Sequence, residues 1–196
     1  MKKSWIIIGI IVVVLIIAYS SMKGTYNNMV TLDEGVTGQW AQVENVYQRR
    51  ADLIPNLVAT VKGYATHEQE TLEGVIEARS KATSVTIDPS NMNAASIQQF
   101  QAAQDGLSSA LSKLMVVVER YPDLKANQNF LELQTQLERT ENRIAVERRN
   151  FNTGAQNYNT YIRTFPKNFY ASVFGFEKKA YFKSQEGADV APKVEF

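Results

Sequence analysis

The sequence contains no cysteine and a single histidine, His67. Without cysteine the chain cannot form a disulfide framework, a cysteine-based zinc or iron–sulfur site, or a thiol nucleophile. With one imidazole it cannot build a histidine-rich metal centre, and any histidine acting as a general base would have to be His67. The sequence also shows no glycine-rich phosphate loop and no serine nucleophile elbow. We therefore predict no catalytic residue, no metal and no cofactor.

The chain also lacks an excess of positive charge. Lysine and arginine number 21 against 20 aspartates and glutamates. Three of the cations, Lys2, Lys3 and Lys23, flank an N-terminal apolar run, which leaves 18 basic against 20 acidic residues beyond residue 23. A slightly acidic remainder does not supply the clustered cations that displace counterions from a phosphate backbone. No nucleic-acid partner is expected.

An uncharged apolar run from residue 5 to residue 22 opens the chain. As a helix it would be about 27 Å long, close to the thickness of the hydrocarbon core of a bilayer. We therefore predict a transmembrane anchor at residues 1–23, with the lipid bilayer as the partner of residues 5–22. Aromatic rings and lysines favour the two membrane interfaces. The residues expected there are Trp5, Tyr19, Lys2, Lys3 and Lys23.

The charges beside this run also bear on its orientation. Two lysines precede it and one follows, which favours a cytoplasmic N-terminus and an extracytoplasmic remainder. The alternative is a cleaved signal peptide, for which Ala18–Ser20 offers a poor small-x-small cleavage site. We therefore predict a single-pass protein of the cytoplasmic membrane.

The remainder of the chain consists of stretches with helical periodicity. Apolar residues recur every three or four positions in four stretches, which indicates amphipathic helices. Turn-forming residues separate the later stretches at Thr83–Asn93, where Asn93 is suited to cap the next helix, and at Tyr121–Asp123. Pro55 lies near the start of the second stretch, where it marks either a kink or a helix start, and the sequence leaves both open.

Long amphipathic helices joined by short connections bury their apolar stripes best as an antiparallel bundle. We therefore predict an all-α protein with a bundle at residues 24–164 and a short aromatic tail at residues 165–196 packed on it. The tail is expected to hold one short helix and an extended end, with Pro192–Phe196 lying on the bundle as an ordered strip. Four glycines are expected to permit close approach of helices: Gly35, Gly38, Gly63 and Gly74.

Long blocks of the chain resemble the LemA family. The first block, residues 44–82, reads ENVYQRRADLIPNLVATVKGYATHEQETLEGVIEARSKA. The second and third, residues 121–152 and 158–166, read YPDLKANQNFLELQTQLERTENRIAVERRNFN and YNTYIRTFP. GFEKKAYF and the closing PKVEF are similar to the C-terminal pattern of the family. Asn168–Ala171 departs from the more aliphatic run expected there, which puts the local packing of the tail in doubt.

The resemblance implies a four-helix bundle behind an N-terminal membrane anchor. It further implies that residues 26–50 and residues 53–82 are separate members of the bundle. It implies no known reaction, and no catalytic residue of the family can be carried over to this sequence.

Several charged residues lie within the family-like blocks and have two interpretations. They form either buried bridges that fix the register of the helices or a surface that binds a partner. These residues are Arg49, Arg50, Asp52, Arg79, Glu141 and Arg143. A metal site at His67, Glu68 and Glu70 is the weaker hypothesis, because the three side chains do not share one face of a helix.

Three hypotheses of function follow. The first is an interaction or scaffold protein that presents one face of its bundle to an unidentified membrane or envelope protein. The second is a self-assembling homo-oligomer that organises the membrane. The third, from a different class, is a hydrolase that uses carboxylates around His67. This hypothesis would end if substitution of His67 and Glu68 left the phenotype unaltered, which is the outcome that we expect.

Overall fold

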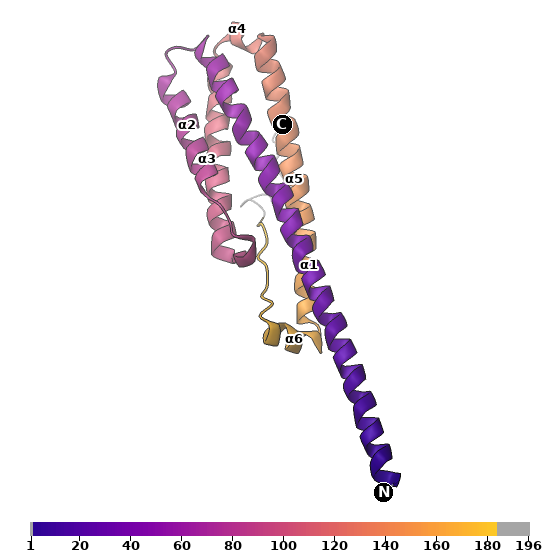
Figure 1. Ribbon diagram of the computed structural model, residues 1–196. Helices are drawn as coiled ribbons and strands as arrows, with labels where there is room; N and C mark the ends of the chain where they lie inside the picture. The colour runs from indigo at the N-terminus through magenta and orange to yellow at the C-terminus, as the bar shows by residue number, and fades with distance from the viewer. Residues whose placement is uncertain (1, 184–196) are drawn as a thin grey trace, which may run out of the picture.

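The computed structural model describes residues 2–183, and the regular structure in that range is entirely helical. The predicted all-α fold is therefore confirmed. Four long helices, α1, α2, α3 and α5, run antiparallel to their neighbours along the chain, and α1 projects far beyond the others (Figure 1). The elements are α1 (Lys2–Lys62), α2 (Gln69–Ser84), the 3-10 helix η1 (Pro89–Asn91), α3 (Ala94–Val118), α4 (Pro122–Lys125), α5 (Gln128–Arg163) and α6 (Lys167–Phe174).

Helix α1 runs without a break through 61 residues, a length of about 90 Å at the usual rise per residue. It therefore crosses from the expected anchor into the bundle as one helix. The expectation that residues 26–50 and 53–82 form separate bundle members is wrong, because the chain reverses only at residues 63–68, between α1 and α2.

Pro55 lies inside α1 and marks no helix boundary. Proline has no N–H group, so the carbonyl of Ala51, one turn earlier, lacks its usual helical donor. Arg79 of α2 fills this position, since its Nε donates a hydrogen bond to the oxygen of Ala51 at 2.7 Å. The helix continues through Pro55 because a neighbouring helix satisfies the carbonyl that the proline leaves free.

Asparagine side chains begin the two later long helices. Asn93 accepts a hydrogen bond from the backbone N–H of Ser96 at 3.0 Å, as predicted for the cap of α3. Asn127 does the same for Phe130 at the start of α5. Each side chain satisfies one of the N–H groups that the first turn of a helix leaves without a partner.

The core consists of two clusters at different heights in the bundle. Helix α1 packs against α5 and α2, and α2 packs against α3. The aromatic cluster lies toward the end from which α1 projects, which we call the anchor end. Its larger buried members are Met29, Val36, Trp40, Val43, Tyr47, Phe100, Phe151, Tyr158, Ile162 and Phe182. The aliphatic cluster lies toward the opposite end, and its larger members are Ile54, Leu57, Val61, Leu72, Leu107, Leu111, Leu114, Leu124, Phe130 and Leu137.

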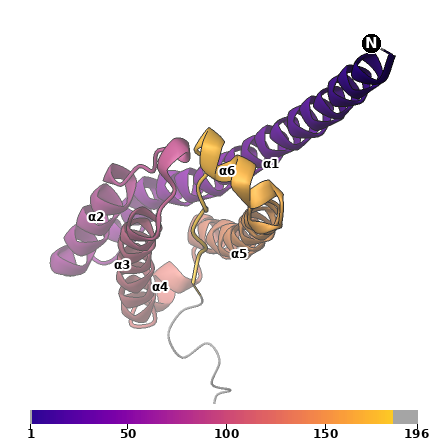
Figure 2. The same cartoon turned by 90° about the horizontal axis from the view of Figure 1, so that it is seen from below.

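The tail returns along the bundle after α6. Gly175 ends α6 with a left-handed backbone, φ 75°, a conformation that glycine adopts without steric cost. Residues 176–183 are extended and run between α3 and α5 (Figure 2). The short helix was predicted, whereas the extended segment at residues 176–183 was not, and the predicted strip at Pro192–Phe196 lies outside the described residues.

The four glycines expected at helix contacts do not serve that purpose. A Cβ atom added to Gly35, Gly38 or Gly74 would meet nothing within 4 Å, and one added to Gly63 would meet only the backbone of its own helix. The close approach occurs instead at Gly154 of α5, where an added Cβ would overlap the side-chain amide of Gln39 of α1.

Candidate functional site

The N-terminal third of α1 lies free of the bundle. The described part of the chain has one helix that is long and apolar enough to cross a membrane, and this is α1. The side chains of residues 3–21 are all exposed, including Trp5 at 70% and Tyr19 at 62%. Lys3 and Lys23 flank the apolar run and are exposed as well. The expected interface residues thus lie at the two ends of an exposed apolar segment of α1.

A buried arginine separates the two core clusters. Arg50 of α1 is only 1% exposed. Its Nη1 donates to Glu141 Oε1 of α5 at 2.7 Å and to Ser108 Oγ of α3 at 3.0 Å. Its Nη2 donates to Gln104 Oε1 at 2.6 Å, while its Nε has no partner in the structure. The guanidinium therefore joins three helices across the middle of the bundle.

Gln104 extends this polar layer to a fourth helix. Its side chain is 5% exposed, and its Nε2 donates to the backbone oxygen of Ala82 in α2 at 3.0 Å. Gln104 is the polar residue that interrupts the apolar stripe of α3. The interruption was visible in the sequence, but nothing there identified Arg50 as its partner.

The six charged residues singled out from the sequence divide by burial. Arg50 lies in the bridge between helices and Arg79 is half-buried against α1. Arg49, Asp52, Glu141 and Arg143 are exposed. Glu141 also accepts from Arg50 in the bridge, so Arg49, Asp52 and Arg143 are the exposed residues outside it, and the partner surface stays a prediction. Arg143 also forms an ion pair with Glu147 at 2.7 Å, four residues along α5.

Two asparagines of α5 hold the extended tail by its backbone. Asn159 accepts from the N–H of Lys179 at 2.9 Å and donates to its carbonyl oxygen at 2.8 Å. Asn152 makes the same pair of bonds to Phe182, both at 2.9 Å. Seven helical residues rise about 10 Å, as three extended residues do, so the two amides match the spacing of the strand. This pairing was missed, although Asn152 and Asn159 lie seven residues apart in the family-like blocks.

A buried ion pair ties the tail to α1. Lys179 is 8% exposed, and its Nζ lies 2.9 Å from Asp33 Oδ1 and 3.2 Å from the oxygen of Pro89. Beside it, the hydroxyl of Tyr158 donates to the oxygen of Glu177 at 2.9 Å. Burial, together with the charges of Asp33 and Glu177, raises the pKa of Tyr158 well above its ordinary value.

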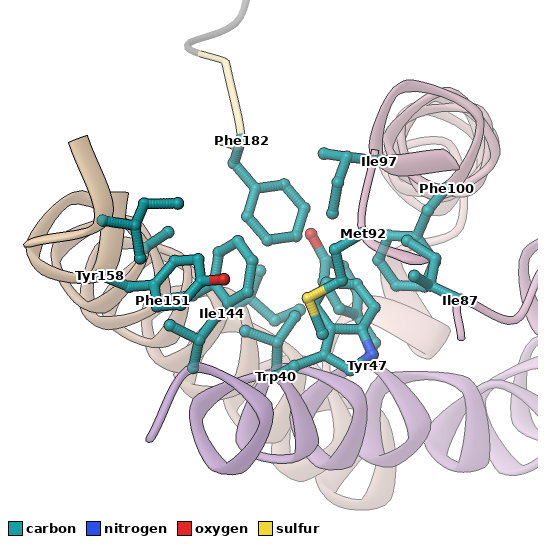
Figure 3. Packing of buried hydrophobic residues seen from close by; sticks show 14 of the residues in the cluster. Trp40, Tyr47, Ile87, Met92, Ile97, Phe100, Ile144, Phe151, Tyr158 and Phe182 are labelled. Carbon is teal, nitrogen blue, oxygen red and sulfur yellow. The ribbon is translucent and has the colours of Figure 1, made fainter. Parts of the chain in front are cut away.

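Phe182 completes the aromatic cluster from outside the helices. Its ring stacks on Trp40 of α1 at 5.9 Å and meets the edge of Phe151 of α5 at 5.5 Å. Phe100 of α3 lies 6.4 Å away, and the four rings converge in Figure 3. The tail therefore supplies a core residue between α3 and α5.

The candidate metal ligands do not converge. Within residues 2–183 no group of three or more histidine, aspartate and glutamate side chains is placed to hold a metal ion. His67 and Glu70 are exposed. Glu68 instead accepts hydrogen bonds from Arg120 at 3.0 Å and from the hydroxyl of Tyr121 at 2.9 Å. The bond to Glu68 raises the pKa of Tyr121.

The exposed apolar segment of α1 is continuous with an antiparallel helical bundle. A polar layer crosses the core of this bundle, and an extended tail closes it. The class of protein is therefore a helical bundle with an apolar N-terminal extension. The LemA family matches residues 39–196, and the chain belongs to this family.

Three relatives show how far this similarity extends. Magnetosome protein MamQ 2 of Paramagnetospirillum magneticum is 27% identical over 93% of this chain and 73% of its own length. Magnetosome protein MamQ of Magnetospirillum gryphiswaldense is 26% identical over 96% of this chain and 77% of its own length. Protein LemA of Metamycoplasma hominis is 26% identical over 87% of this chain and 74% of its own length.

Proposed function

We propose that this protein is a membrane-anchored interaction protein. Helix α1 holds the bundle at a fixed distance from the membrane. The observation that supports this most is the continuity of α1, which is one helix from the exposed apolar run to the turn at residue 63. An anchor confines the bundle to a plane and raises its effective concentration toward membrane neighbours, so weak contacts suffice for binding.

The polar groups inside and beside the bundle core make structural contacts, which favours binding over catalysis. Arg50 and Gln104 bond to neighbouring helices, Lys179 pairs with Asp33, and Glu68 bonds to Arg120. Each of these groups is occupied by a contact that holds the fold.

We propose that the partner binds the exposed charges beside the polar layer. Arg49 of α1 and Arg143 of α5 are exposed and lie on the two helices that Arg50 and Glu141 join. The test is mild crosslinking in the native membrane, followed by capture of wild type and of a variant carrying Arg49→Glu and Arg143→Glu. Partners that crosslink to wild type should be lost from the variant.

The matched control places charge reversals at Lys113→Glu and Lys125→Glu, which are also exposed. These substitutions should leave the crosslinked partners in place. Equal recovery from wild type and both variants would contradict the proposed surface, and a chain that crosslinks to no other protein would contradict the function.

We also propose that the N-terminus is cytoplasmic and the bundle extracytoplasmic. The chain has no cysteine, so a single Thr86→Cys in the exposed connection between α2 and α3 gives one labelling site. A membrane-impermeant maleimide should label it in intact cells. Protection until lysis would reverse the topology.

A further inference from the structure

Apolar side chains on α6 and in the turn before it form an exposed stripe in the described structure. Phe165 is 84% exposed, Phe169 66% and Val173 62%. Phe169 and Val173 lie four residues apart in α6, so they share one face of that helix. Phe165 lies in the turn before α6. Ala171 lies on the opposite face and is buried against the bundle. The stripe therefore points away from the bundle.

The position of α6 determines what this stripe meets. Helix α6 lies across the anchor end of the bundle, beside the point where α1 leaves it (Figures 1 and 2). Tyr26 of α1 contacts α6 directly, because its ring meets the edge of Phe174 at a centroid distance of 5.0 Å. Helix α6 therefore lies at the same position along the axis of α1 as Tyr26.

That position coincides with the headgroup layer of a bilayer spanned by α1. Tyr26 lies four residues, or about 6 Å, beyond Met22, the last residue of the apolar run. The polar layer of each leaflet is about 5–8 Å thick, which is half the difference between the thickness of the whole bilayer and that of its hydrocarbon core. Aromatic rings favour this layer, so the ring pair and the exposed stripe lie at a depth that suits them.

The polar residues around the stripe suit a lipid surface as well. Arg163 and Lys178 are exposed and line a shallow groove beside α6 together with Asn168, Ser172 and Glu177. The exposed Lys23 lies on α1, three residues before Tyr26. Exposed cations beside an apolar stripe bind anionic headgroups, as in helices that lie in the membrane interface.

We infer that α6 and the turn before it form a second membrane contact, which inserts Phe165, Phe169 and Val173 into the headgroup region of the leaflet that α1 crosses. This inference rests on the proposed membrane anchoring by α1. Two contacts side by side hold the bundle at one angle to the membrane, whereas a single helix would leave it free to tilt and rotate.

The test uses the full chain in vesicles of phosphatidylcholine and phosphatidylglycerol, with one environment-sensitive fluorophore on an introduced cysteine. Lipids that carry a nitroxide quencher on the headgroup or deep in the acyl chain report the depth of the probe. A probe at Phe169→Cys should be quenched by the headgroup nitroxide. A probe at Leu15→Cys should be quenched by the acyl-chain nitroxide, and one at Asp123→Cys, at the far end of the bundle, by neither.

The outcomes separate the two proposals. Quenching at Leu15→Cys without quenching at Phe169→Cys would overturn the role of α6 and leave the anchor intact. Absence of quenching at both positions would overturn the anchor itself. A further variant carries the fluorophore at Val173→Cys together with the substitutions Phe165→Asn and Phe169→Asn. The headgroup nitroxide should no longer quench this probe. Unchanged quenching would also overturn the inference.

Discussion

The aromatic and aliphatic clusters are built in different ways. The aliphatic cluster consists of side chains from the helices, such as Leu57, Leu72 and Leu114, and of Ala65 in the turn between α1 and α2. The aromatic cluster includes Phe182 from the extended tail, fixed by Asn152 and Asn159. One half of the bundle is therefore closed by the helices and a turn between two of them, and the other half needs an extended segment from the tail.

The largest expected effect comes from removing the tail's core residue. Phe182→Ala should lower the free energy of unfolding by about 3–5 kcal/mol, the usual cost of deleting a buried phenylalanine. In a Trp5→Phe background the fluorescence of Trp40, which stacks on Phe182, reports the aromatic cluster directly during denaturation.

Leu114→Ala is the matched substitution in the aliphatic cluster. It should cost about 2–5 kcal/mol and leave the native emission of Trp40 unchanged, whereas Phe182→Ala should alter that emission. A native Trp40 spectrum that is the same in both variants would contradict the assignment of Phe182 to the aromatic cluster.

The second effect concerns the polar layer between the clusters. Arg50→Ala should lower the free energy of unfolding by about 1.5–3 kcal/mol, the range for hydrogen bonds to a charged group. We expect no more than this, since Glu141 is 47% exposed and regains solvent. Arg50→Lys should recover only part of the loss, because an ammonium cannot reproduce the guanidinium fork. Chemical denaturation measures the free energy of unfolding of both variants. If Arg50→Ala left this free energy unchanged, the result would contradict the bridge.

The tail backbone gives a smaller and more local effect. Asn159→Ala leaves the N–H and carbonyl of Lys179 without partners, which should cost about 1–3 kcal/mol. Hydrogen exchange should become faster at Lys179 and remain unchanged in α2. Asn157→Ala, at an exposed position of the same helix, should change neither quantity, and equal exchange at Lys179 in the two variants would argue against the asparagine clamp.

Alkaline pH should weaken the aromatic cluster first. The pKa of Tyr158 is raised above its ordinary value of 10.0 by burial, and that of Tyr47 is raised for the same reason. Above pH 10 the unfolded chain loses these protons before the folded chain does, so stability falls as pH rises. Tyr158→Phe should flatten the fall in denaturation midpoint above pH 10, and an identical pH profile would refute a contribution from Tyr158.

The smallest expected effect compares two glycines. Gly74→Ala should stabilise the protein by about 0.5–1 kcal/mol, because alanine favours a helix and the added methyl group has open space. Gly154→Ala should stabilise less or destabilise, since the methyl group must displace the amide of Gln39. Thermal unfolding decides the order, and a larger gain at Gly154 would contradict the close approach of α1 and α5.

Periodicity predicted the stripes of the helices and the position of most turns. Trp40, Val43 and Tyr47 are buried where the spacing placed them, because the period of an α-helix fixes which residues share a face. The cap at Asn93 was predicted for the same local reason. The fold class and the anchor depend on patterns within single segments, and these are legible in a sequence.

The features that were missed depend on groups from distant segments. The sequence left Pro55 open as a kink or a helix start, because the carbonyl that it frees inside α1 is satisfied by Arg79 of another helix. The role of Gln104 depends on Arg50, and the extended segment at residues 176–183 depends on asparagines of α5. Such partners are brought together only by the tertiary fold.

The continuity of α1 is tested most directly by a distance across the point where the anchor enters the bundle. Nitroxide labels on Ser20→Cys and Asn45→Cys, both exposed, stand on nearly the same face of the helix, 25 residues apart. In vesicles, pulsed electron paramagnetic resonance should give one narrow distribution near the helical rise of about 38 Å. A broad or clearly shorter distribution would show a flexible joint between the anchor and the bundle and would contradict the rigid connection.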